Sequence, residues 1–270
     1  MNRHTPLSHI IDVTRPSVAR MHNYYLGGKD NYPADRQACE RLLEHAPSTQ
    51  ILAVNNRRFL QRVIRFLAQE RGVRQFLDIG AGLPTRDNAH EMAQRYSAEA
   101  RVIYVDNDPM VLAYGRALLE ENANTAVIQA DLRHPDAILD HPRLAELFDL
   151  NEPVAALCIS VLHCIHDDDA PADLLRRISS RLCSGSYLAV SQLVSEDATV
   201  RRVITGLMRD STAGKWGAVR RPKDVDGFFA GLDLLEPGLV DVSAWRADPR
   251  FGPRPRTQEW VEYGGVGRVR

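Results

Sequence analysis

Short apolar runs and helix-like apolar patterns alternate along most of the chain. Between residues 57 and 69, apolar side chains recur every three or four positions, which predicts an amphipathic helix. After Gly72, apolar runs predict strands at residues 74–79, 101–105, 125–129, 153–161 and 186–193. Helical patterns lie between and after them at residues 87–96, 109–121, 135–147, 170–182 and 197–210, the third broken near Pro142. The tail predicts a short helix at 225–230 and strands at 232–242 and 259–266.

Strands that alternate with helical stretches indicate βαβ units and a mostly parallel sheet. The fourth run is apolar throughout, as expected for a strand that is covered on both faces. The pattern therefore predicts an α/β fold with a doubly wound sheet in residues 71–270. Residues 1–70 are predicted to form a helical N-terminal extension that packs on this domain as a lid.

Composition and charge are those of an ordinary globular protein. The net charge is −1, so no overall field attracts nucleic acid or anionic lipid. Pairs of adjacent arginines lie on separate predicted segments and are offset by 35 acidic residues, which favours solvated surfaces. The longest apolar stretch, residues 154–159, is too short to span a bilayer, and no signal-peptide pattern opens the chain. We expect a cytoplasmic protein without a membrane or nucleic-acid partner, and the oligomeric state stays open.

The cysteines and the lysines are distributed in ways that bear on function. The four cysteines include no C-x-x-C pair, so we expect reduced, structural thiols and no metal site; they are Cys39, Cys158, Cys164 and Cys183. Of the 34 basic residues, three are lysines: Lys29, Lys215 and Lys223. A GC-rich coding bias accounts for such a preference for arginine.

Candidate binding residues follow the first predicted strand. In doubly wound sheets, ligands bind at the carboxyl ends of the strands. There the chain reads Asp78-Ile-Gly80-Ala81-Gly82, in which the glycines permit a tight turn and a close approach of a ligand to the backbone. The third glycine of the dinucleotide fingerprint is replaced by Thr85. Alone, this turn is as compatible with a structural role as with binding.

Carboxylates also follow the second and third predicted strands. Asp106 and Asn107 stand where a carboxylate commonly accepts hydrogen bonds from ribose hydroxyls, and Asp108 is suited to cap the next helix. After the third strand, Asp131 is suited to the exocyclic amine of adenine and Leu132 to its ring, although Asp131 is equally compatible with an ordinary turn. Together these signals predict an adenosine pocket and favour S-adenosylmethionine over a dinucleotide.

Residues that follow the fourth predicted strand are candidates for the reacting end of the site. The segment from Ser160 through His163 to His166 is expected to face the reacting group, and His163 is the candidate base or acceptor-orienting residue. The alternative is that His166 and the three aspartates after it form a solvated loop before a helix. Consecutive aspartates seldom converge on one metal ion.

The N-terminal segment from Arg15 to Arg36 contains an unusual mixture of polar and aromatic residues. Ser17 is suited to begin a helix that ends at the paired glycines 27 and 28. Capping does not explain Asn23, Tyr24 and Lys29, so we interpret this segment as a lid over the cofactor.

The segment PSVARMHNYYLGGKDNYPADR resembles the signature of a family of S-adenosylmethionine-dependent methyltransferases found mainly in actinobacteria, long catalogued as a domain of unknown function. The resemblance continues through FLDIGAGLPT, YVDNDPMVL, QADLRHPDAIL and AALCISVLH to the closing YGGVGRV. It implies a Rossmann-like class I methyltransferase sheet of seven strands, the last antiparallel.

Carried over by position, the resemblance implies contacts to the methionine part of the cofactor from Gly80 and Gly82, to the ribose from Asp106 and to the adenine from Asp131. It also implies that Asn23, Tyr24 and Lys29 contact the cofactor or form the lid. This chain has Asn23 where the family usually has an aspartate, and Cys164 where an aromatic residue often follows the histidine.

These observations predict a methyltransferase that uses S-adenosylmethionine and acts on an oxygen or nitrogen of a small molecule. Its expected cofactor residues are Asn23, Tyr24, Lys29, Asp78, Gly80, Ala81, Gly82, Asp106, Asn107, Asp131, Leu132 and Ser160. A non-catalytic sensor of S-adenosylmethionine is the main alternative. An NAD-dependent oxidoreductase is disfavoured by Thr85 and leaves Asp131 unexplained.

Overall fold

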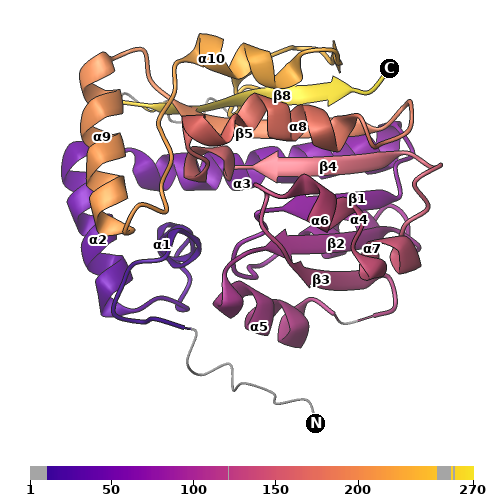
Figure 1. The fold of residues 1–270 in the computed structure, drawn as a ribbon, viewed down its shortest axis with the longest axis horizontal. Helices are drawn as coiled ribbons and strands as arrows, with labels where there is room; N and C mark the ends of the chain where they lie inside the picture. Colours follow the sequence, from indigo (N-terminus) through magenta and orange to yellow (C-terminus); the bar gives the residue numbers. More distant parts are fainter. Residues whose placement is uncertain (1–10, 121, 248–256, 258) are drawn as a thin grey trace.

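A sheet of eight strands forms the centre of the computed structural model, which describes residues 11–120, 122–247, 257 and 259–270 (Figure 1). The strand order is β3-β2-β1-β4-β5-β8-β6, and β7 also pairs with β8. The first five strands are parallel: β1 (Gln75–Ile79), β2 (Arg101–Asp106), β3 (Thr125–Gln129), β4 (Val154–Ile159) and β5 (Tyr187–Val194). The antiparallel partner of β5 is β8 (Val261–Arg268), so the predicted doubly wound sheet is confirmed.

Two short strands replace the single strand predicted at residues 232–242. They are β6 (Asp233–Leu234) and β7 (Val240–Asp241), and both pair with β8. Pro237 has no backbone N–H to donate, and Gly238 adopts a φ of +83°, which suits a turn rather than a strand. The sheet therefore has one more strand than predicted, at its far edge.

Helices cover both faces of the sheet. One face packs against α3 (Thr49–Arg65), α4 (Ala89–Gln94) and α5 (Pro109–Leu118). The other packs against α6 (Pro135–Leu139), α7 (Pro142–Leu147), α8 (Pro171–Ser179) and α10 (Pro222–Asp226). All residues of β4 are buried, as predicted from its apolar run, and all residues of β5 are buried as well. The break near Pro142 separates α6 from α7.

The N-terminal helices build a third core at one end of the sheet. Here α1 (Val18–Tyr25) and α2 (Pro33–His45) lie at the same end of the molecule as α9 (Ala198–Ser211) (Figure 1). Their side chains pack with those of α9, Trp216 and Trp260. The predicted helix at 57–69 is α3, which begins earlier and continues into a π-helical turn, Phe66–Glu70. Since α3 shares a core with β1 and β2, we use the term N-terminal lid for α1 and α2 and their connection only.

A buried ion pair holds the N-terminal lid together. The Asp35 carboxylate accepts hydrogen bonds from Arg20 Nε at 2.8 Å, from Ser17 N at 2.9 Å and from Tyr32 N at 2.8 Å. The side chains of Arg20 and Asp35 are both almost fully buried. Removing one member of such a pair leaves the other charge buried and unpaired, which is strongly destabilising.

Candidate functional site

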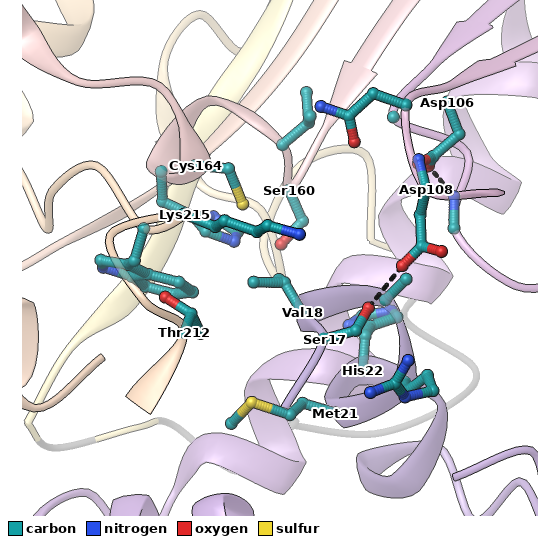
Figure 2. Close-up of a pocket in the computed structure, with 18 of the residues that line it drawn as sticks. Ser17, Val18, Met21, His22, Asp106, Asp108, Ser160, Cys164, Thr212 and Lys215 are labelled. Atoms are coloured by element: carbon teal, nitrogen blue, oxygen red, sulfur yellow. Dashed lines mark hydrogen bonds between the residues drawn. The ribbon is translucent and has the colours of Figure 1, made fainter. Parts of the chain in front are cut away.

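A cavity of about 680 Å³ lies at the carboxyl ends of β1, β2 and β4, between the sheet and α1 (Figure 2). The structure brings most of the predicted site residues to its wall. Those that line it are Asp78, Gly80, Ala81, Gly82, Asp106, Asn107, Asp131, Leu132, Ser160 and His163. Parallel strands direct their carboxyl ends to one edge of the sheet, so residues far apart in sequence meet there.

The two glycines of the loop after β1 differ in the space around them. Gly80 has a φ of +77°, and a Cβ at this position would stand 2.3 Å from Val161 Cγ2, so the protein itself fills the space. Gly82 has a φ of +67°, yet a Cβ there would meet no heavy atom within 4 Å. The loop is therefore packed at Gly80 and open at Gly82, where a ligand can approach the backbone.

Asp106, at the end of β2, links the glycine loop to the start of α5. Its carboxylate accepts hydrogen bonds from Gly82 N and Asp108 N, both at 2.9 Å. Burial raises the pKa of Asp106 to about 6. Asp108 caps α5 as predicted, since Oδ1 accepts from Met110 N at 2.8 Å.

Ser17 connects the N-terminal lid to the sheet. It immediately precedes α1, as predicted, but its side chain does not cap that helix. Ser17 Oγ instead donates a hydrogen bond to Asp108 Oδ2 at 2.6 Å (Figure 2). The same aspartate thus caps α5 and anchors α1 beside the cavity.

Asp131, after β3, is held by its neighbours. Asn107 Nδ2 donates to Oδ2 at 2.9 Å, and Arg133 donates to both carboxylate oxygens, at 3.0 and 2.6 Å. Burial alone would raise the pKa of Asp131, but these hydrogen bonds hold it well below its usual range. Asp131 is therefore ionised at neutral pH.

His163 lies in the wall of the cavity rather than in an open loop. Only 3% of its side chain is exposed, and its ring packs on Trp216 with 4.3 Å between the centroids. Burial, followed by the charges of His22 and Arg220, lowers the pKa of His163 to about 3. The imidazole is therefore neutral at pH 7, and Nδ1 finds no hydrogen-bond partner within the described part of the chain.

The structure does not bring Asn23, Tyr24 and Lys29 to the cavity wall. Asn23 is buried, and its Oδ1 accepts hydrogen bonds from Asp30 N and Asn31 Nδ2, both at 3.1 Å, which fixes the loop after α1. Tyr24 packs on the core of the N-terminal lid, and Lys29 is exposed.

The other face of α1 meets the cavity instead. At helical spacing it presents Val18, Met21 and His22, together with Ser17 just before the helix (Figure 2). The N-terminal segment does adjoin the cavity, but by different residues than those predicted.

Sequence reasoning missed the residues that reach the cavity from the C-terminal third of the chain. They are Leu193, Met208, Thr212, Lys215, Trp216, Trp260 and Glu262. Two of them carried a signal in the sequence. Lys215 is one of the three lysines, and its side chain extends toward Ser160 in Figure 2. Glu262 is a charged residue within a strand that is otherwise largely apolar.

The described residues contain neither a metal-binding cluster nor a membrane-spanning helix. No group of three or more His, Cys, Asp or Glu side chains among these residues is arranged to hold a metal ion. No helix in the same ranges is long and apolar enough to cross a membrane. All four cysteines lie within them and are free thiols.

Comparisons with known proteins agree with the resemblance. A solved structure from Thermobifida fusca is 38% identical, covers 96% of this chain and 97% of its own, and has a TM-score of 0.89. A DUF574 family protein from Streptomyces avermitilis is also 38% identical, covers 96% of this chain and 99% of its own, and has a TM-score of 0.88. Both source organisms are actinobacteria, as the resemblance implied.

A more distant structure supports the fold alone. An O-methyltransferase family protein from Burkholderia thailandensis is 11% identical, covers 97% of this chain and 67% of its own, and has a TM-score of 0.54. No curated protein matches the sequence.

The family model described as S-adenosyl methyltransferase matches residues 4–270. Because that match spans almost the whole chain, and two relatives share its length and fold, this protein belongs to the S-adenosyl methyltransferase family and uses S-adenosylmethionine as methyl donor.

Proposed function

We propose that this methyltransferase acts on a hydroxyl or amine group of a small molecule. The observation that carries the proposal is the extent of the cavity, which continues past the cofactor residues to the ends of β4, β5 and β8. In that second half, α1 and residues 212–216 also line the wall (Figure 2). An acceptor that shares about 680 Å³ with the cofactor is a small molecule.

The residues at the ends of the first three strands fit S-adenosylmethionine. The open space at Gly82 suits the methionine part, together with Asp78, Gly80 and Ala81. Asp106 and Asn107 are suited to the ribose hydroxyls. At the adenine, we assign Asp131 to the exocyclic amine and Leu132 to the ring, with Ser160 nearer the methyl group. When bound, the cofactor supplies an activated methyl group on a positively charged sulfur, and the protein orients and shields the reactants.

His163 is assigned to positioning the acceptor. Its neutral imidazole is packed against Trp216 and lines the half of the cavity away from the adenosine residues. A side chain whose pKa is about 3 is a weak base at neutral pH, so orientation suits it better than proton abstraction.

The arginines favour a small acceptor over a nucleic acid. Both members of the pair on α8 form ion pairs, Arg176 with Asp173 and Arg177 with Asp136. In the adjacent pair Arg220 and Arg221, the buried Arg220 forms an ion pair with Asp167, and Arg221 forms one with Asp224. Guanidinium groups that are already paired with carboxylates do not form an uncompensated phosphate-binding surface.

Calorimetry with S-adenosylmethionine, S-adenosylhomocysteine and NAD tests the cofactor site. We expect micromolar binding of the first two and none of NAD. Asp106→Ala should weaken S-adenosylmethionine binding about 10- to 100-fold, because it removes a charge-assisted hydrogen bond. Glu99→Ala is the matched control, since Glu99 is exposed beside Arg74 before β2 and does not line the cavity. Equal losses in both variants would contradict this assignment.

The acceptor class needs a separate measurement. We expect release of S-adenosylhomocysteine when the enzyme is offered a panel of small phenols, alcohols and amines. Binding of S-adenosylmethionine without turnover on any of them, but with turnover on RNA or DNA, would overturn the small-molecule proposal.

A further inference from the structure

Four buried polar atoms in the second half of the cavity have no hydrogen-bond partner among the described residues. They are His163 Nδ1, Trp216 Nε1, Trp260 Nε1 and Glu262 Oε2. All four residues line the cavity, and each is at least 97% buried. Buried polar groups are normally paired, so a cluster without partners at a cavity wall indicates a ligand that pairs with them.

The strand order separates this cluster from the cofactor residues. Except for Ser160 after β4, the cofactor contacts proposed on the sheet lie at the ends of β1, β2 and β3, which form one side of the sheet. Glu262 lies on β8, beyond β4 and β5, and pairs in register with Leu193 of β5. The cluster is therefore at the acceptor end of the cavity.

Glu262 is the one carboxylate in this cluster. Its side chain is only 2% exposed, and Oε1 accepts a hydrogen bond from Ser160 Oγ at the end of β4. Ser191 lies beside it, but its hydroxyl donates to Asn56 Oδ1 at 2.7 Å. No ion pair to Glu262 occurs within the part of the chain that the structure describes. Keeping a buried carboxyl without a cation is costly for stability, so its retention indicates a function.

The chemistry of the four atoms defines a complementary ligand. The two indole N–H groups donate, Glu262 Oε2 accepts, and neutral His163 Nδ1 does either according to its tautomer. A hydroxyl group both donates and accepts, and an amine donates. The wall beside the cluster includes the indole side chains of Trp216 and Trp260, and aromatic walls of this kind suit a flat ring.

We propose that Glu262 binds the nucleophilic O–H or N–H of a flat, ring-containing acceptor and takes up its proton during methyl transfer. This inference rests on the proposed function. A lone pair of the acceptor oxygen or nitrogen forms the new bond to the methyl carbon. The sulfur–methyl bond breaks, and its electron pair stays on sulfur, giving the neutral thioether. The acceptor proton passes to Glu262 Oε2, and the carboxylic acid later releases it to water.

Burial favours Glu262 over His163 as the group that takes up the proton. Burial raises the pKa of Glu262 to about 7, which matches a base that works near neutral pH. The same effect lowers the pKa of His163 to about 3, which makes it a weak base. The hydrogen bond from Ser160 fixes Oε1, and Oε2 has no partner among the described residues, so it is the oxygen that remains for the acceptor.

Two probes of matched shape test the inference without turnover. We would measure binding of 2-naphthol and 2-methylnaphthalene to the protein loaded with S-adenosylhomocysteine. The wild type should bind the naphthol at least about 10-fold more tightly, because a site built for a hydroxyl rejects the analogue that lacks it. Glu262→Gln should reduce this preference to about threefold or less, and Glu262→Met should abolish it.

Glu259→Gln is the control variant. Glu259 precedes β8, its carboxylate accepts from Ser48 Oγ, and it does not line the cavity, so the preference for naphthol should stay as in the wild type. Neither Glu262 variant should melt more than about 3 °C below the wild type, because a buried carboxyl without a cation does not stabilise the fold. A purely structural role would instead lower the melting temperature and leave the preference intact.

The outcomes separate the two proposals. If the wild type fails to bind S-adenosylmethionine, the proposed function fails. If it binds the cofactor but not 2-naphthol, or binds both probes equally, the inference about Glu262 is wrong while the proposed function stands. A preference for 2-naphthol that survives in either Glu262→Gln or Glu262→Met also overturns it, and two variants are used so that one folded variant is enough for this comparison.

Discussion

Burial, more than any neighbouring charge, sets the state of the titratable side chains around the cavity. It raises the pKa of Asp78 to about 7, of Asp106 to about 6 and of Glu262 to about 7. It lowers the pKa of His22 to about 4 and of His163 to about 3. At these five side chains burial therefore favours the neutral form, whereas hydrogen bonds keep Asp131 ionised.

A cationic ligand lowers the raised pKa values of the carboxyl groups around the cavity. The sulfonium of S-adenosylmethionine stabilises nearby carboxylates, whereas S-adenosylhomocysteine has no such charge. In the free protein, the raised pKa of Asp106 means that the folded state holds its proton more tightly than the unfolded state. That contribution to stability is full below about pH 4 and is lost as the pH rises through about 6.

Affinity for S-adenosylmethionine should therefore rise with pH. In the proposed site, ribose hydroxyls donate to the ionised form of Asp106, so protonation of this residue would compete with binding. We expect binding at pH 5 to be about 10-fold weaker than at pH 7, since one proton must leave a group with a pKa of about 6. Calorimetry across this range measures the slope, and Asp106→Asn should reduce it. An unchanged slope in Asp106→Asn would assign the proton to another group, such as Asp78.

At the scale of elements, the sequence predicted the interior of the sheet better than its edge. β1, β4 and β5 are buried on both faces, and they are rich in apolar residues for that reason, with β4 apolar throughout. β6 and β7 have two residues each and are not buried, so they leave little pattern to read. The predicted strand at 232–242 failed for this reason.

The residues of the candidate site also divide into those that the sequence can predict and those that depend on tertiary packing. Asp106 and Asp131 were predictable because the topology alone brings strand ends together. Which face of α1 meets the cavity depends on how α1 packs against α2 and α9, and the segment's composition does not specify that. Asn23 looked functional, but its side chain fixes a loop. Glu262 and Trp216 join the site only through the packing of distant segments.

The β5–β8 pair requires a glycine at one point of close approach. A Cβ at Gly264 would stand 1.9 Å from Val190 O, which belongs to the neighbouring backbone. Gly264→Ala should lower the free energy of unfolding by at least about 2 kcal/mol, because the strands must separate. Gly206→Ala, at an exposed position of α9 with no atom near the new Cβ, should raise it by about 0.5–1 kcal/mol. Urea denaturation of both variants measures the difference, and similar changes would contradict the strand contact.

At the scale of the whole molecule, the cavity lies where separately packed cores meet. Two cores fill the faces of the sheet, and a third joins the N-terminal lid to α9, Trp216 and Trp260. Ser17 bridges the lid to Asp108, and the Arg20–Asp35 pair holds α1 on α2. A ligand in the cavity therefore contacts the lid and the sheet together, and its binding stabilises their contact.

Hydrogen exchange should detect this coupling. On binding S-adenosylhomocysteine, amides of α1 and of residues 80–82 should gain protection, because α1 residues and the glycine loop line the same cavity. Amides of α8 should change little, since α8 packs on the opposite face of the sheet from α3. Arg20→Met should lower the protection of α1 in the free protein, because it leaves Asp35 buried without its cation. Ligand binding should then restore part of that protection, with lower affinity than in the wild type. Equal gains in α1 and α8 would instead indicate that the ligand tightens the whole molecule, and the lid would have no special part in binding.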